Sequence, residues 1–146
     1  MKWILKSFDE LTKQELYSLL RLRAEVFVVE QDCPYQDVDN KDQLAKHLLG
    51  IVKDEVVAYL RIFNPGDYFQ EIAIGRVVSK PTYRGTGLGH QLMQQAIHYI
   101  DSTFTNKDIR ISAQAHLKDF YESYGFKQVG EGYLEDGIPH IGMLRK

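Results

Sequence analysis

Apolar residues occur along the chain in short runs, and their spacing changes between that of strands and that of helices. Runs rich in β-branched and aromatic residues predict strands at residues 2–8, 47–53, 56–63, 72–78, 109–113, 126–129 and 141–144. Helical spacing from Leu16 to Phe27 and from Leu88 to Ile100 predicts two helices, and 116–124 a shorter one that ends at Gly125. The order of elements is that of an α/β protein.

Local signals define several of the boundaries. Thr12 and Glu15 form a capping-box pair that places a helix start just after Thr12. The polar segment 31–43 predicts a loop with at most a short helical turn. Gly75 inside the otherwise apolar run 72–78 predicts a β-bulge. Arg76 is the one charge in that run, and we expect a structural ion pair because buried charges need partners.

The segment Arg84-Gly85-Thr86-Gly87-Leu88-Gly89 lies between a strand run and a helical run. Glycines permit positive φ and close approach of another molecule to the backbone. The first N–H groups of a helix lack partners within the helix, and the helix dipole adds partial positive charge there. The segment therefore predicts a phosphate or pyrophosphate site.

The spacing of this segment excludes two common phosphate loops. A Walker A loop requires Gly-Lys-Ser/Thr at its end, and no Lys follows Gly89. A Rossmann fingerprint requires Gly-x-Gly-x-x-Gly, whereas these glycines are evenly spaced. A tight strand-to-helix turn without a ligand is the alternative interpretation.

Composition fits one soluble globular domain spanning residues 1–146. The chain is 44% hydrophobic and 26% charged, with a net charge of −2 and no basic stripe for nucleic acid. Its single cysteine, Cys33, excludes an internal disulfide and a multi-cysteine zinc site, and no metal site is expected. No long apolar run or signal-peptide pattern occurs, so we expect no membrane partner and a cytoplasmic location.

The glycine segment fits Gln/Arg-x-x-Gly-x-Gly/Ala and resembles the pyrophosphate loop of the GNAT superfamily of acetyl-CoA-dependent N-acyltransferases. Residues 120–126 resemble the family's Tyr-x-x-x-Gly-Phe segment. Within the superfamily, further segments are similar to the ElaA family: 26–31 with Asp39, Asp42 and His47, then 75–78, 113–116 and 135–141. The resemblance implies a GNAT fold, with a mixed, mostly antiparallel twisted sheet, two splayed central parallel strands and flanking helices.

The resemblance also implies acetyl-CoA as co-substrate and assigns residues to it. The cofactor would lie between strands 72–78 and 109–113, against backbone groups of Val77 or Val78. Tyr121 aligns with the family tyrosine that faces the CoA sulfur, and a phenol is protonated at neutral pH, so Tyr121 is the candidate general acid. The expected cofactor-binding set is Val77, Val78, Arg84, Gly85, Thr86, Gly87, Leu88, Gly89 and Tyr121.

The general base is left open among three residues. His140 and His47 titrate near neutrality when unperturbed and belong to the ElaA-like segments, and Glu71 precedes the central strand. We expect the acceptor side to comprise Glu30, Gln114, Glu135 and Asp136. The acidic set Glu30, Asp32, Asp37, Asp39 and Asp42 fits either attraction of a cationic acceptor or a solvated loop face.

The expected activity is transfer of an acetyl group to a small-molecule or peptide amine, directly within a ternary complex. A protein or peptide N-acetyltransferase and a non-catalytic acyl-CoA sensor remain alternatives. A toxin that acts on aminoacyl-tRNA is disfavoured, because tRNA binding depends on Lys and Arg contacts to phosphates. A homodimer is left open.

Overall fold

The computed structural model describes residues 1–146 and contains one seven-stranded sheet, in the order β1-β2-β3-β4-β5-β7-β6. Strands β4 and β5 are parallel, and every other neighbouring pair is antiparallel. The strands are β1 (Lys2–Ser7), β2 (Lys46–Val52), β3 (Glu55–Phe63), β4 (Ile72–Ser79), β5 (Ile109–Gln114), β6 (Lys127–Glu135) and β7 (Ile138–Arg145). The helices are η1 (Phe8–Glu10), α1 (Lys13–Arg23), η2 (Ala24–Glu30), η3 (Asp42–Leu44), η4 (Pro81–Tyr83), α2 (Leu88–Thr103), η5 (Ala115–Leu117) and α3 (Lys118–Glu122). The predicted α/β class is confirmed.

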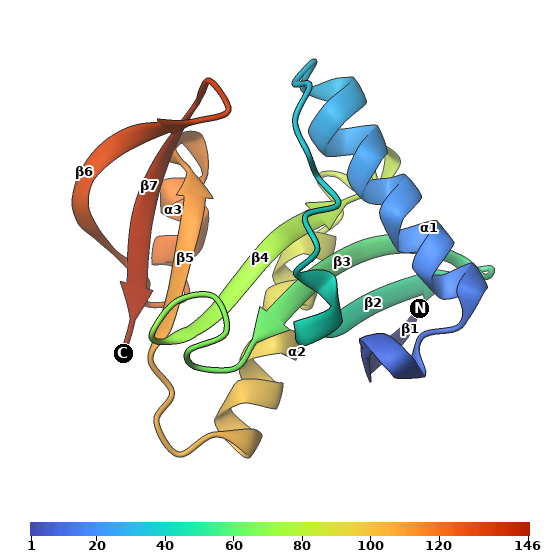
Figure 1. Ribbon diagram of the computed structural model, residues 1–146, viewed down its shortest axis with the longest axis horizontal. Coiled ribbons are helices and arrows are strands. Elements are labelled where there is room, and N and C mark those ends of the chain that lie inside the picture. Colours follow the sequence, from blue (N-terminus) through green and yellow to red (C-terminus); the bar gives the residue numbers. More distant parts are fainter.

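Helices cover both faces of the sheet (Figure 1). On one face, α1 packs on β3 through a small apolar cluster: Leu19, Leu22, Val26, Leu49, Val56, Tyr59 and Val78. On the other face, α2 and α3 share the main core, to which Leu92, Met93, Ala96, Tyr121 and Phe126 contribute. None of the helices is both long and apolar enough to cross a bilayer.

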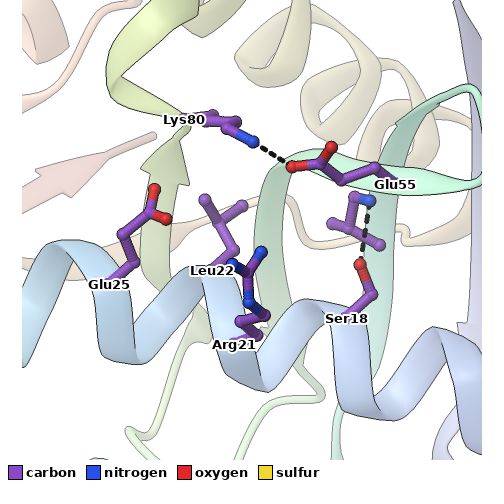
Figure 2. A pocket seen from close by; sticks show the side chains of 7 residues that line it. Ser18, Arg21, Leu22, Glu25, Glu55 and Lys80 are labelled. Atoms are coloured by element: carbon purple, nitrogen blue, oxygen red, sulfur yellow. Dashed lines mark hydrogen bonds and ion pairs between the residues drawn. The ribbon is translucent and has the colours of Figure 1, made fainter.

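The start of α1 follows the predicted capping box. The Glu15 N–H donates to the Thr12 hydroxyl at 3.0 Å, and the Thr12 N–H donates to the Glu15 carboxylate at 2.9 Å. Farther along α1, the Ser18 hydroxyl accepts from the Val56 N–H at 3.0 Å and ties the helix to β3. A small surface pocket lies between α1 and the β-sheet, and the ion pair between Lys80 and Glu55 lines it (Figure 2). It lies apart from the cleft described below.

The helical segment continues past Arg23, the last residue of α1, as the π-helix η2. The Gln31 N–H donates to the Val26 carbonyl and the Cys33 N–H to the Val28 carbonyl, both with the five-residue spacing of a π-helix. The sequence predicted an ordinary helix here, and its apolar spacing carried no signal for the change to a π-helix. The π segment carries Glu30 to the rim of the cleft.

Strands β4 and β5 are joined at one end only. Their parallel pairing is limited to Ile72 with Ile109 and Ala73 with Arg110, after which the strands separate (Figure 1). The predicted bulge is present next to Gly75: on β4, Arg76 and Val77 together oppose the single residue Leu60 of β3. Arg76 has a φ of 53°, a strained value for a residue with a side chain. The bulge turns β4 away from β5.

The last hairpin is longer than the sequence predicted. Strands β6 and β7 extend to a tight turn at Asp136 and Gly137, whose φ values are 52° and 78°. Pro139 and His140 are thus strand residues, paired with Leu134 and Tyr133. The sequence did not show this because β6 is exposed along most of its length and lacks apolar alternation.

Candidate active site

The separation of β4 and β5 forms a cleft with a volume of about 1140 Å³. Its walls come from η2, the bulge of β4, the glycine segment, β5, α3 and the tip of the β6–β7 hairpin. Elements from both halves of the chain therefore meet at one site, and most of the residues selected from the sequence lie along it.

One end of the cleft is formed by the glycine segment. Gly85 and Gly87 have φ values of 79° and 81°, and no atom lies within 4 Å of where a Cβ would stand on either. None of the backbone N–H groups from residue 85 to residue 90 donates to an acceptor within the protein. Free N–H donors at a helix start, with open space in front of them, fit a diphosphate.

Five of the six predicted loop residues line the cleft: Arg84, Gly85, Gly87, Leu88 and Gly89. Thr86 does not. Its hydroxyl donates to the Tyr83 carbonyl at 2.5 Å, so the side chain closes the turn instead of facing the cleft. Thr86 is therefore placed as a structural residue of the loop, and only its N–H group remains available to an anion.

The open edge of β4 follows from its pairing with β3. The Lys80 N–H donates to the Val57 carbonyl, so Lys80 faces β3. Because peptide groups alternate in direction along a strand, Val78 also faces β3 and the backbone of Val77 faces the cleft. Val77 and Val78 were alternative candidates for the backbone contact to the cofactor. The register of β4 against β3 favours the N–H of Val77. The side chain of Val78 packs in the apolar cluster under α1.

Tyr121 reaches the cleft from α3. The residue is 5% exposed, and its hydroxyl has no hydrogen-bond partner within the protein although it lies on the cleft wall. Burial raises the pKa of Tyr121 above that of a free phenol. The hydroxyl is therefore protonated across the neutral range, on a residue of the cleft wall, and its proton is not used in a hydrogen bond within the protein.

His140 lies in β7 and also lines the cleft. Its Nδ1 is 2.7 Å from the Ile138 carbonyl, which accepts only, so Nδ1 carries a proton. Its Nε2 is 3.4 Å from a carboxylate oxygen of Glu135, and the Tyr133 ring stacks on the imidazole. Ser112 donates to the same carboxylate at 3.3 Å. The ring is held in one orientation, with Nε2 as the atom free to exchange a proton.

The predicted acceptor-side residues also line the cleft. Glu30 forms a two-contact ion pair with Arg84, at 2.8 and 2.5 Å. Gln114 donates to Gln31 at 3.3 Å. Glu135 and Asp136 are at the hairpin tip, and no Lys or Arg pairs with either. Cleft residues that the sequence did not single out include Tyr35, Gln36, Tyr68 and Ser112, which lie in no recognisable motif.

His47 is not part of this cleft. It is fully buried in β2, where Nε2 donates to the Asp42 carbonyl at 2.8 Å and Nδ1 lies 2.6 Å from the Tyr59 hydroxyl. Burial lowers the pKa of His47, and the charges of Arg23 and Arg61 act in the same direction. The expectation of a base at this position is wrong, because both ring nitrogens are used to hold the core.

Glu71 is likewise outside the cleft. Its carboxylate forms two contacts with Arg110 of β5, at 3.0 and 3.2 Å, beside the joined end of β4 and β5. Hydrogen bonding to Arg110 lowers the pKa of Glu71, which makes it a weaker base. Glu71 therefore joins the start of β4 to β5 through an ion pair and is not positioned to accept a proton in the cleft.

Three carboxylates of the acidic loop are turned inward and paired. Asp37, Asp39 and Asp42 are held by three arginines: Arg23, Arg61 and Arg76. Burial by itself would raise the pKa of Asp39, but the hydrogen bonds and charge of Arg61 outweigh it and the pKa is lowered. These three carboxylates are unavailable to an acceptor, which corrects that part of the acidic-set hypothesis. The structural ion pair expected for Arg76 is present. No pattern in the sequence pointed to the buried roles of Arg23 and Arg61.

Comparisons with known proteins identify the family to which this chain belongs. A sequence model of the acetyltransferase (GNAT) domain matches residues 9–146. The chain is 47% identical to an acyl-CoA N-acyltransferase from Pseudomonas aeruginosa, whose crystal structure superposes with a TM-score of 0.94 over 100% of both chains. An aminoglycoside 6′-N-acetyltransferase complexed with coenzyme A shares the fold, with a TM-score of 0.71 at 14% identity over 97% of this chain and 96% of that one.

A second relative narrows the family. Protein ElaA of Escherichia coli is 45% identical over 148 residues, which cover 100% of this chain and 97% of ElaA. The crystal structure of that protein superposes with a TM-score of 0.92 over 100% of both chains. The chain belongs to the GNAT acetyltransferases and, within them, to the ElaA-like family.

Proposed function

We propose that the protein transfers an acyl group, acetyl in the first instance, from acyl-CoA to a primary amine in a ternary complex. The observation that carries this proposal is the joint placement of Tyr121, His140 and the free N–H groups of residues 85–90 along one cleft. A donor for the leaving group, an acceptor for the amine proton and an anion site are the groups that acyl transfer requires.

The residues present fit the cofactor. The N–H groups of the glycine segment and the guanidinium of Arg84 would hold its diphosphate. The unpaired edges of β4 and β5 offer backbone groups to an extended amide chain, as a missing strand would. When bound, acyl-CoA supplies an activated thioester carbonyl. The protein's own groups would transfer protons and stabilise the charge that develops on the carbonyl oxygen.

His140 would take the proton of the acceptor ammonium. Its Nδ1–H is fixed on the Ile138 carbonyl, so Nε2 presents the lone pair when the ring is neutral. The Glu135 carboxylate, 3.4 Å away, stabilises the ring once it is charged. The same carboxylate attracts the ammonium form of the amine, so binding and deprotonation use neighbouring atoms.

The remaining two steps fall to β4 and α3. The Val77 N–H would donate to the carbonyl oxygen as negative charge develops on it during attack. Tyr121 would give its proton to the departing sulfur, for which its protonated, unpartnered hydroxyl is suited. Its phenolate would recover a proton from the nitrogen of the new amide, which loses its second proton at this step. No covalent enzyme intermediate is needed, and Cys33, which also lines the cleft, has no step to perform.

Turnover of acetyl-CoA with a panel of primary amines, followed as free thiol release, tests this function. Acyl transfer to any amine, with the acylated product identified by mass spectrometry, would establish the activity. Cys33→Ser should retain turnover, because transfer is direct. CoA binding without transfer to any small amine or peptide amine would favour the sensor instead.

A further inference from the structure

The closest contact across the mouth of the cleft is the ion pair between Glu30 and Arg84. Two nitrogen–oxygen contacts, at 2.8 and 2.5 Å, join the end of η2 to the residue that precedes the first glycine of the loop. Both side chains are partly exposed, at 38% and 48%. The pair thus links the acceptor wall of the cleft directly to the anion site.

Of the two arginines on the cleft wall, Arg84 is the one placed to meet a phosphate. Arg76 is the other Lys or Arg on the cleft wall, and Asp37 and Asp39 hold its guanidinium. Arg84 has the single partner Glu30 and stands beside the free N–H groups of residues 85–90. A diphosphate bound there would come within reach of this guanidinium.

Glu30 occupies the terminal pair of N–H groups of Arg84, and a diphosphate that binds through this pair displaces the carboxylate. A guanidinium recognises carboxylate and phosphate with the same planar pair of N–H groups. An exposed carboxylate pair contributes little to stability, whereas a diphosphate also gains the backbone N–H donors. The balance therefore favours the diphosphate whenever it is present.

We propose that Arg84 is shared between Glu30 and the cofactor diphosphate, so that CoA binding releases the Glu30 carboxylate to a cationic acceptor. This inference rests on the proposed function. After the exchange, Glu30, Glu135 and Asp136 all line the cleft without a Lys or Arg partner. The acceptor end then attracts a cation more strongly than in the free protein, and the cofactor binds before the amine.

The affinity for CoA, measured by calorimetry, tests the competition. Glu30→Gln removes the competing carboxylate and should lower the CoA Kd by about two- to five-fold, the range for an exposed ion pair. Glu25→Gln is the matched control, because it removes the same charge from the same helix but lies away from Arg84 and the cleft. In an Arg84→Gln background, Glu30→Gln should give a smaller gain. An unchanged or weaker CoA affinity in Glu30→Gln would mean that Glu30 orders Arg84 and would overturn the exchange.

The pKa of the Glu30 carboxylate gives a second test, which does not require turnover. Hydrogen bonding to Arg84 lowers the pKa of Glu30 in the free protein. ¹³C NMR of labelled glutamate should show this pKa rising when CoA is added, and no change on addition of pantetheine, which lacks the diphosphate. A Glu30 signal unmoved by saturating CoA contradicts the exchange even where transfer occurs. Failure of the wild-type protein to bind CoA would instead remove the proposed function.

Discussion

The Nδ1 atom of His140 lies 2.7 Å from the carbonyl oxygen of Ile138, two residues earlier in the same strand. This short contact fixes the tautomer of the ring, because a carbonyl oxygen accepts but does not donate. Nε2 is left facing Glu135 inside the cleft. A histidine with one nitrogen anchored to its own backbone and the other directed at a carboxylate is arranged to exchange a proton.

Replacing His140 should therefore reduce acyl transfer without affecting cofactor binding. For His140→Gln we expect kcat/KM to fall by about 10²- to 10⁴-fold, the usual contribution of a general base. The limb of the pH–rate profile that reports the base should disappear. CoA affinity by calorimetry should stay near that of the wild type. His98→Gln, on the exposed side of α2, is the control. Wild-type turnover in His140→Gln would leave this residue as a structural part of the hairpin.

Tyr121→Phe removes one proton donor and almost no volume. The hydroxyl has no partner within the protein, so the variant should fold with little change in stability. We expect kcat to fall about 10²-fold with CoA affinity retained. Steady-state kinetics beside calorimetry separate the two quantities. An unaltered kcat would identify Tyr121 as a core tyrosine, packed against Phe120 and Phe126.

The parts of the site that could be predicted from the sequence depend on contacts close along the chain. The capping box of Thr12 and Glu15 and the positive φ of Gly85 and Gly87 follow from residues within a few positions of each other. The GNAT resemblance supplied the overall fold and the separation of β4 from β5, which is confirmed. It also selected His140, which the structure places on the cleft wall.

The expectations that failed concern titratable groups whose surroundings are set only in the folded chain. Glu71 looked available until the fold brought Arg110 beside it, 39 residues later. His47 was a candidate base because it belongs to an ElaA-like segment, but burial and its contacts with Tyr59 and Asp42 hold it in the core. Burial and long-range pairing decide which titratable groups remain free, and neither has a local signal in the sequence.

The glycine loop gives a prediction for ligand binding alone. CoA should raise the melting temperature, because a ligand that binds only the folded state stabilises it by about 2.7 kcal/mol at a hundredfold excess over Kd. Gly87→Glu should abolish this shift by placing a carboxylate in the space before the free N–H groups. Gly66→Glu is the matched control: Gly66 also has a positive φ and open surroundings, but it is outside the cleft. A full CoA shift in Gly87→Glu would rule out the anion site.

The buried His47 gives a prediction for stability against pH. Burial lowers its folded pKa below the ordinary value of 6.5, so the unfolded chain binds the proton more readily than the native state. The contribution of this group is fully present above pH 6.5, and stability should fall as the pH drops from 6.5 towards the lowered folded pKa. Urea unfolding followed by circular dichroism across this range measures the slope. His47→Gln should be less stable at neutral pH, through loss of hydrogen bonds to Asp42 and Tyr59, and should show a smaller slope. At a temperature where His47→Gln remains folded, its kcat should match that of the wild type. A large loss of kcat in the folded variant would show that His47 takes part in catalysis.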